Sequence, residues 1–265
     1  GLGAIDGSGR ALREKFGDKA RMRLLLAVNS SDLHFEGVMF RDPGSWNTQI
    51  LLCRNVVLRN IKLMNDTELS NTDGFDPDAS RNLLIENCFA YCSDDNVAVK
   101  TTGYSNYLGD AENITVRGCV FLTKKSSLKV GTETRGARMS GITFEDNDVL
   151  ESDRGMALYV SDGTALSNVR YLNNRFERSH PDSKRMMFQF SVNARRKDSP
   201  VGSIRGVEIR NCSFLTPFPK APEIKCPARG DIEGVVFENL TVGGEKILTP
   251  GQIGLKCVNA EVTFK

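Results

Sequence analysis

The chain has 265 residues, of which 40% are hydrophobic, and its formal net charge is +2. No tail or stripe of lysine and arginine is present, which argues against nucleic acid as a partner. No apolar run of 18 residues is present either, which argues against a membrane partner. We therefore expect one elongated domain over residues 1–265. Because Gly1-Leu2-Gly3 is not a natural start, we expect this domain to lack its N-terminal cap.

A short segment that opens with Asn, Gly or Asp and then alternates apolar and polar residues recurs along the chain. The eight copies begin at Asp32, Asn55, Asn82, Asn113, Gly141, Asn168, Gly206 and Gly234, with spacings of 23, 27, 31, 28, 27, 38 and 28 residues. Such alternation is typical of a strand, and no copy has a helical period. The repeat predicts an all-β fold, a right-handed parallel β-helix whose coils bury their apolar faces against one another. A β-propeller or sandwich is the alternative, and the scarcity of Asn-Gly hairpin signals counts against both.

Two further positions of the repeat carry recurrent residues. The sixth position is often asparagine, which suits a sharp turn and would form an amide ladder in stacked coils, at Asn60, Asn87, Asn173, Asn211 and Asn239. The seventh position holds Cys88, Cys119 and Cys212, which predicts a row of small buried thiols. A disulfide, for example between Cys88 and Cys92, remains the alternative because spacing cannot establish a pairing.

A second set of apolar segments follows the first and sets the register of the coils. These segments lie at 48–52, 74–76, 96–100, 128–131, 156–160 and 187–190. We expect their buried side chains to stack inside the solenoid, in the order Phe75, Val97, Leu128 and Met156. This register places Asp73 over Asp95, about 4.8 Å away along the stack. Ser126 and then Arg154 follow on the next two coils.

Three aspartates meet at one place in this register. Asp73 lies in the segment 71–77, and Asp94 and Asp95 lie in the segment 93–100. Clustered carboxylates raise one another's pKa, so such a cluster predicts acid/base chemistry or a cation site. Strict alternation would send Asp94 and Asp95 to opposite faces of a strand, and we therefore expect a bend or bulge at Asp94.

The same motifs resemble those of the polygalacturonase-like glycoside hydrolases, family 28 and its β-helical relatives in the pectin lyase-like superfamily. The matching segments are Gly3-Ala-Ile-Asp-Gly-Ser-Gly, Ser45-Trp46, Asn71-Thr-Asp-Gly-Phe-Asp-Pro and Asp94-Asp-Asn-Val-Ala-Val-Lys, within a resemblance that extends from Gly3 to about residue 175. By this resemblance Asp94 is the general acid, Asp73 and Asp95 are bases that activate water, and hydrolysis inverts the anomeric centre. Room for that water requires carboxylates ~6.5–9.5 Å apart, and the reaction needs neither cofactor nor metal.

The sequence departs from the family at two motifs. Lys125-Ser126-Ser127 replaces the family's Gly-His-Gly, and Ala157-Leu158-Tyr159 replaces the Arg-Ile-Lys that holds a uronate carboxylate. Neither of the two histidines, His34 and His180, is expected at the site. The substrate class therefore stays open between a pectin-like polymer and a neutral α-glucan.

Seven residues are candidates for substrate binding. They are Trp46, Lys100, Lys129, Glu133, Arg135, Arg154 and Tyr159. Lys129, Arg135 and Arg154 offer positive charge for a carboxylate. Tyr159 suits stacking on a sugar face, whereas Trp46 is either a sugar platform or a packing residue. Glu133 is either a sugar contact or one side of an internal ion pair.

Three functions compete for this sequence. An inverting hydrolase acting on a polysaccharide or oligosaccharide is favoured by the three aspartates. A polysaccharide lyase would need an Arg or Lys base and a calcium-bridged uronate, and a non-catalytic carbohydrate-binding β-helix would need neither. We expect a monomer, secreted or periplasmic, because polymeric glycans are mostly met outside the cytoplasm.

Overall fold

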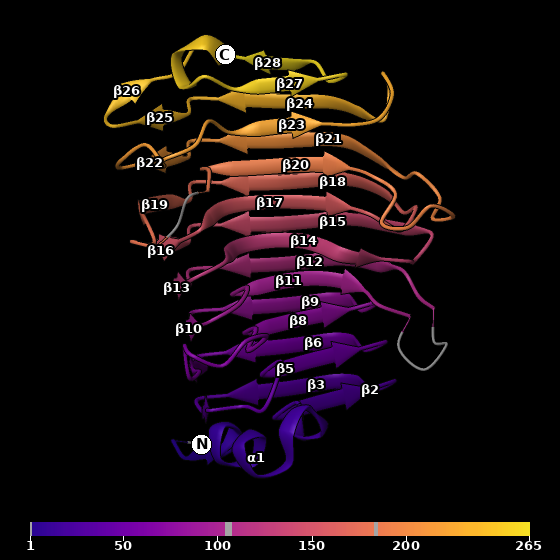
Figure 1. Ribbon diagram of the computed structural model, residues 1–265, viewed down its shortest axis with the longest axis vertical. Coiled ribbons are helices and arrows are strands. Elements are labelled where there is room, and N and C mark those ends of the chain that lie inside the picture. The colour runs from indigo at the N-terminus through magenta and orange to yellow at the C-terminus, as the bar shows by residue number, and fades with distance from the viewer. Residues whose placement is uncertain (1, 104–107, 183–184) are drawn as a thin grey trace.

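The computed structural model describes residues 2–103, 108–182 and 185–265. In these ranges the chain winds into a stack of coils built from three sheets, with the two termini at opposite ends (Figure 1). The predicted parallel β-helix is thereby confirmed. The described helices are α1 (Gly9–Phe16) at the N-terminal end of the stack and two 3-10 turns, η1 (Gly17–Ala20) and η3 (Pro250–Ile253). None of them is long and apolar enough to cross a membrane.

The eight predicted repeat strands lie side by side in one nine-stranded parallel sheet. Its strands are β3 (Ser31–Glu36), β6 (Arg54–Arg59), β9 (Arg81–Glu86), β12 (Ala111–Arg117), β15 (Arg138–Glu145), β18 (Ala165–Leu172), β21 (Ser203–Arg210), β24 (Ile232–Glu238) and β28 (Val262–Phe264). Apolar residues pair with apolar residues, as Val56, Leu83 and Ile114 do on successive coils. The ninth strand, β28, is one that the repeat pattern did not reveal.

The second predicted set of segments forms another nine-stranded sheet. Its strands are β2 (Leu25–Val28), β5 (Thr48–Leu51), β8 (Phe75–Asp78), β11 (Val97–Thr101), β14 (Ser126–Thr134), β17 (Arg154–Val160), β20 (Phe188–Val192), β23 (Glu223–Lys225) and β27 (Lys256–Val258). Phe75, Val97, Leu128 and Met156 stack in the predicted register and are fully buried. The register of the carboxylate turns was therefore predicted correctly.

A third sheet was not predicted, because its strands have only two to five residues and show no clear alternation. It consists of β1 (Ala4–Asp6), β4 (Met39–Arg41), β7 (Lys62–Met64), β10 (Phe89–Cys92), β13 (Val120–Thr123), β16 (Asp148–Ser152), β19 (Arg175–Ser179), β22 (Ser213–Phe214), β25 (Thr241–Val242) and β26 (Glu245–Lys246). All neighbours are parallel except β25 and β26. The turns from this sheet to the second sheet carry the carboxylates.

The asparagine turns form as predicted, and the three thiols are buried as predicted, but only Cys88 and Cys119 stack on each other, since Asn147 and Asn174 occupy the column before Cys212. The sixth-position asparagines all have positive φ, and the amides of Asn211 and Asn239 each donate to the previous asparagine, at 3.1 and 3.0 Å. All seven cysteines are free, which excludes the alternative of a disulfide. The backbone N–H of Cys88 points at the sulfur of Cys119, 3.4 Å away on the next coil.

Candidate active site

The segment that carries Asp73 is a turn between β7 and β8, and its neighbours tie it to the next coil. The Asn71 amide donates to the Asp94 carboxylate at 3.4 Å, and the hydroxyls of Thr72 and Ser93 share a hydrogen bond of 2.8 Å. A Cβ at Gly74 would lie 2.5 Å from a carbonyl oxygen of the next coil, so only glycine fits there. The motif therefore fixes one turn against another before any chemistry is considered.

Asp94 and Asp95 lie in the next turn, between β10 and β11, where the chain bends over residues 93–96. This is the bend that the adjacent aspartates required. The Asp95 N–H donates to Asp94 Oδ1 at 3.0 Å, and the Thr123 hydroxyl donates to the Asp94 carbonyl oxygen. Asp95 is 4% exposed, whereas Asp94 is only half-buried. Of the two, Asp94 is therefore the carboxyl that a substrate can reach.

The three carboxylates meet as predicted, with one oxygen of each lying within 4.8 Å of the others. The expected separation of ~6.5–9.5 Å is therefore not met by these oxygens. For Asp73 and Asp95 the reason is geometric, because they occupy equivalent positions on adjacent coils about 4.8 Å apart. Asp94 is the chain neighbour of Asp95 in the same turn, so its carboxylate lies close to both.

Lys100 lies beneath the cleft and does not line it. Its Nζ is 2.9 Å from Asp73 Oδ2, 2.7 Å from Asp76 Oδ1 and 3.5 Å from the centre of the Trp46 ring. Lys100, Asp73 and Asp76 are each at most 3% exposed. Both lysine and tryptophan were predicted as substrate contacts. In the structure they contact each other, and Asp76 joins the site through Lys100.

A second lysine holds Asp95. Lys129 Nζ lies 2.5 Å from Asp95 Oδ2, and the Ser126 N–H donates to Asp95 Oδ1 at 3.0 Å. Lys129 points away from the core, as predicted from the buried Leu128 and Val130, and its ammonium group is bonded to a catalytic candidate. The three carboxylates are close enough together to bind a cation between them. Lys100 and Lys129 supply positive charge at this place.

The surroundings give the three carboxylates different proton affinities. Burial raises the pKa of Asp94 to about 7, and the neighbouring charges of Asp73 and Asp95 add to the effect. Burial acts on Asp95 as well, but Lys129, together with Lys100 and the Ser126 N–H, outweighs it and holds the pKa of Asp95 below its usual value. Burial raises the pKa of Asp73 in spite of Lys100. The cluster thus contains one carboxyl suited to carry a proton and one suited to stay ionised.

The remaining predicted binding residues lie on the C-terminal side of the cluster. Arg154 donates to Asp153 at 2.8 Å and to the Ser126 hydroxyl at 3.3 Å. The Tyr159 hydroxyl donates to Gln189 at 2.5 Å, so the ring is anchored at its polar end.

Glu133 and Arg135 follow at the end of β14 and just beyond it. Glu133 forms an ion pair of 3.4 Å with Arg195, which is the internal pairing that the sequence left open. Arg135 is exposed, and its contact with a substrate stays a prediction.

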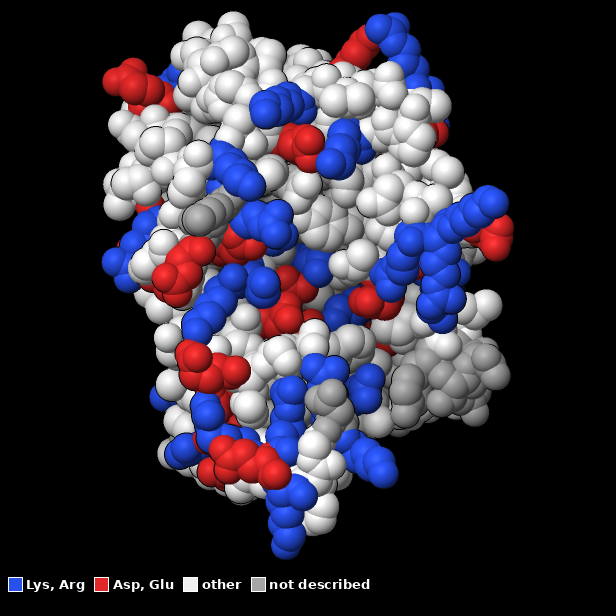
Figure 2. All heavy atoms as spheres, viewed as in Figure 1, with Lys and Arg blue, Asp and Glu red and all other residues white. Residues whose placement is uncertain are grey.

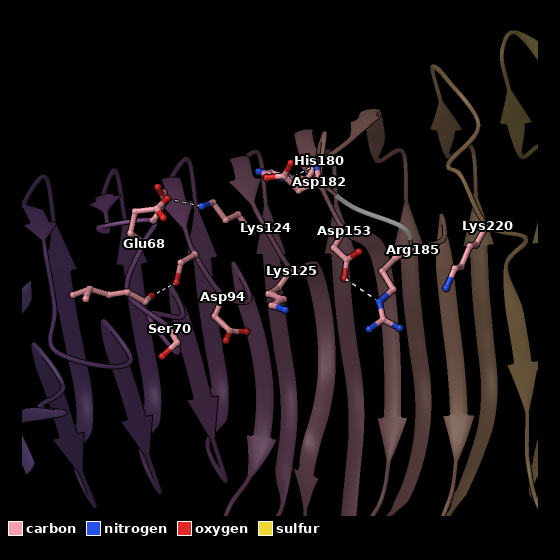
Figure 3. Close-up of a pocket in the computed structure, with 13 residues that line it drawn as sticks. Glu68, Ser70, Asp94, Lys124, Lys125, Asp153, His180, Asp182, Arg185 and Lys220 are labelled. Atoms are coloured by element: carbon pink, nitrogen blue, oxygen red, sulfur yellow. Dashed lines mark hydrogen bonds and ion pairs between the residues drawn. The ribbon is translucent and has the colours of Figure 1, made fainter. Parts of the chain in front are cut away.

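Asp94 opens into a cavity of about 610 Å³. The cavity is lined by Thr67, Glu68, Leu69, Ser70, Ser93, Asp94, Lys124, Lys125, Asp153, His180, Asp182, Arg185 and Lys220. Figure 2 shows acidic atoms at the bottom of a hollow with lysine and arginine atoms around it. Figure 3 shows Asp94, Lys125, Asp153, Arg185 and Lys220 following one another along the stack.

Four of these lining residues are cations that the sequence analysis did not propose as binding residues: Lys124, Lys125, Arg185 and Lys220. A signal existed for Lys125, because the register that pairs Asp95 with Ser126 places Lys125 next to Asp94. No such signal exists for Arg185 and Lys220, which lie outside the regular repeat. His180, which was not expected here, lines the cavity and lies 3.5 Å from Glu151, away from the three aspartates.

Comparison with known proteins extends these observations. Residues 1–183 match the family described as glycosyl hydrolases family 28. A probable polygalacturonase from Vitis vinifera is 28% identical over 171 residues, covering 61% of this chain and 34% of that protein. A probable endo-xylogalacturonan hydrolase A from Aspergillus fumigatus is 27% identical over 286 residues, covering 98% of this chain and 68% of that protein. This chain thus spans about a third of the grape protein.

The solved structures share the fold. An exopolygalacturonase from Thermotoga maritima has a TM-score of 0.69 at 21% identity, covering 89% of this chain and 52% of that one.

Proposed function

The chain belongs to glycosyl hydrolase family 28, and we propose that it hydrolyses glycosidic bonds of a pectic, uronate-containing polysaccharide with inversion. The observation that carries this proposal is the difference in pKa and exposure between Asp94 and Asp95. Asp94 has a pKa of about 7 and opens into a cavity whose lining includes the exposed cations Lys125 and Lys220 as well as carboxylates. Asp95 beside it is held ionised by Lys129.

In the proposed mechanism, Asp94 donates its proton to the glycosidic oxygen as the bond to the leaving group breaks. Asp95 accepts a proton from the water that attacks the anomeric carbon. Both oxygens of Asp95 already accept hydrogen bonds, from Lys129 and from the Ser126 N–H, and its carboxylate lies beneath the cleft. These contacts favour Asp95 as a base toward water over Asp95 as a nucleophile, and so favour inversion despite the short spacing of the carboxylates.

The cations favour a uronate over a neutral glucan. Lys125 and Lys220 are exposed at the cavity, and Arg185 lies between them along the stack. Cations bind carboxylates by charge-assisted hydrogen bonds, which neutral sugars cannot form. Names of relatives point the same way, since they include a polygalacturonase and a xylogalacturonan hydrolase.

The structure offers less support for a lyase. Such an enzyme needs a lysine or arginine that can accept a proton, and the lysines nearest the cluster are Lys100 and Lys129. Each is bonded to a carboxylate, and Asp73 and Asp76 raise the pKa of Lys100 above its usual value although burial opposes them. An extracellular location and a monomeric state remain predictions.

The test is release of reducing ends from homogalacturonan, xylogalacturonan, rhamnogalacturonan, dextran and α-1,3-glucan. We expect cleavage of a uronate-containing polymer, and Asp94→Asn to lower kcat about 10²–10⁴-fold because the acid is lost. Exposed Asp198, changed to Asn, is the matched control and should leave the rate unchanged. NMR of the first product should show the anomer opposite to that of the cleaved bond. Cleavage of dextran alone would refute the uronate assignment, and unsaturated products would identify a lyase.

The pH dependence follows from the same groups. Because Asp94 must be protonated, kcat/KM should fall as the pH rises through about 7. Asp95 must be ionised and its pKa is lowered, so the acid limb should lie below the usual range of a carboxylate. Stability should also fall as the pH rises from 4 toward 7, because folded Asp94 holds its proton where unfolded Asp94 has lost it. Asp94→Asn should reduce this loss by the part that Asp94 contributes, as thermal unfolding at pH 5 and pH 8 would show.

A further inference from the structure

Lys129 occupies a place in the sheet that leaves room for a long side chain to bend toward the turn. On the strand before it the paired residue is Ala98, and on the strand after it the paired residue is Ala157. Between two such small neighbours the lysine side chain is 11% exposed, and its ammonium group contacts Asp95. The ammonium group can thus reach back to the turn of the previous coil.

Both oxygens of Asp95 are held by the same strand. Oδ2 accepts from Lys129 Nζ at 2.5 Å, and Oδ1 accepts from the backbone N–H of Ser126 at 3.0 Å. Ser126 and Lys129 both belong to β14, so one rigid element fixes the position and the plane of the carboxylate. Asp73 differs, because one of its oxygens contacts Lys100 and the other, Oδ1, is buried without a hydrogen-bond partner among the described residues.

Other charged groups surround the pair on every side. Asp73 and Lys100 face it from the previous coil, Asp94 from the same turn, Glu133 from the end of β14, and Arg154 and Tyr159 from the next coil. Lys100 is already shared between Asp73 and Asp76. Without Lys129, the three clustered carboxylates and Asp76 would have Lys100 as the only lysine at hydrogen-bond distance among the described residues.

We propose that Lys129 is a positioning residue that keeps Asp95 ionised and aimed at the attacking water, and thereby leaves the proton of the cluster on Asp94. The role rests on the proposed hydrolytic function, since it acts through the base of that reaction. Lys129 takes no proton itself and does not touch the glycosidic bond. Its effect is electrostatic: the cation lowers the pKa of Asp95, and the anion so maintained helps to raise the pKa of Asp94.

The experiment compares wild type with Lys129→Met, which removes the charge, and Lys129→Arg, which retains it. In Lys129→Met the acid limb of the kcat/KM profile should move up by about one pH unit or more, because Asp95 loses its cation. At the optimum kcat should fall about 10–100-fold with little change in KM. The reason is that the base acts in the transition state and does not contribute to substrate binding. Lys129→Arg should restore most of the acid limb. Lys62→Met, in the exposed part of β7, is the control and should change neither quantity.

A second measurement does not depend on activity. Titration of ¹³C-labelled aspartate carboxyl groups by NMR should show, in wild type, a carboxylate of lowered pKa that is absent in Asp95→Asn, which assigns it to Asp95. That carboxylate should titrate at higher pH in Lys129→Met. A lowered Tm with an unmoved acid limb and unmoved titration would overturn the proposal and leave Lys129 a purely structural residue. Lack of any cleavage by wild type would refute the hydrolase, yet the NMR shift would still decide whether Lys129 sets the ionisation of Asp95.

Discussion

Two sets of turns in this β-helix place polar side chains directly over one another on adjacent coils, and the two sets satisfy these side chains in different ways. At the turns of the repeat sheet, asparagine stacks on asparagine: the Asn113 amide donates to Asn82 at 2.8 Å, and the Asn82 amide donates to Asn55 at 3.1 Å. At the carboxylate turns, Asp73 and Asp95 occupy equivalent positions on adjacent coils, and each contacts its own lysine, Lys100 and Lys129 respectively. An amide both donates and accepts, so it can stack on itself indefinitely. A carboxylate only accepts, so a column of aspartates needs cations.

This difference explains why the site required two lysines from neighbouring strands. Lys100 on β11 serves Asp73 and Asp76, and Lys129 on β14 serves Asp95. Asp94 alone lacks a lysine at hydrogen-bond distance among the described residues, and it is the carboxyl with a pKa of about 7. Burial is the main cause of that raised pKa, and among the described residues no lysine at hydrogen-bond distance offsets it at Asp94 as Lys129 does at Asp95.

Among substitutions at the two sets of turns, Lys100→Met should have the largest effect on stability. Removing one partner of a buried ion pair leaves an uncompensated charge and should lower the free energy of unfolding by about 3–5 kcal/mol. Because Asp73 and Asp76 can then be neutralised only by protons, the loss should be larger at pH 8 than at pH 4. Denaturant unfolding at both pH values measures it.

A double variant separates two effects of Lys100→Met, the loss of the positive charge and the loss of side-chain packing. Lys100→Met with Asp76→Asn removes one anion along with the cation, and it should recover part of the lost stability. If the double variant were less stable than Lys100→Met at pH 8, the account of Lys100 as the counter-ion of Asp76 would be wrong.

The repeat made most of the fold predictable. Eight copies with an apolar period of two and a recurrent asparagine turn identify two of the three sheets and their register. The third sheet was not predicted, because strands such as Lys62–Met64 and Thr241–Val242 are too short to show an apolar period. The helix α1 escaped as well, since it lies before the first copy.

The site was predictable where it follows the register and not elsewhere. Stacking alone brought Asp73 and Asp95 together. It could not show that Lys100 bends beneath Trp46 or that Lys129 reaches back to the previous coil, because side-chain direction off a strand is not fixed by spacing. Arg185 and Lys220 approach the cavity from segments between the regular strands, where sequence carries no register.

Cations that line the cavity should affect substrate choice and leave the acid intact. In Lys125→Gln we expect KM for polygalacturonate to rise about tenfold, equivalent to ~1.4 kcal/mol, because one charge-assisted contact is lost. Lys220→Gln, farther along the stack from Asp94, should have a smaller effect. The measurement is initial rates on polygalacturonate and on its methyl ester. Equal losses on both polymers would show that Lys125 does not recognise a carboxylate.

The asparagine turns offer the mildest way to test the comparison. Asn82 has φ of 52° and sits between two amide contacts in the ladder. Asn82→Ala removes the amide and leaves a residue that tolerates the left-handed region less well than asparagine, so it should lower the free energy of unfolding by about 1–2 kcal/mol. Asn82→Gly loses only the amide contacts, and the chain already uses Gly141 and Gly206 at the same position with positive φ. Asn82→Gly should therefore cost less than Asn82→Ala in denaturant unfolding, with activity unchanged in both. If Ala and Gly cost the same, the ladder hydrogen bonds would outweigh backbone conformation in selecting asparagine at these turns.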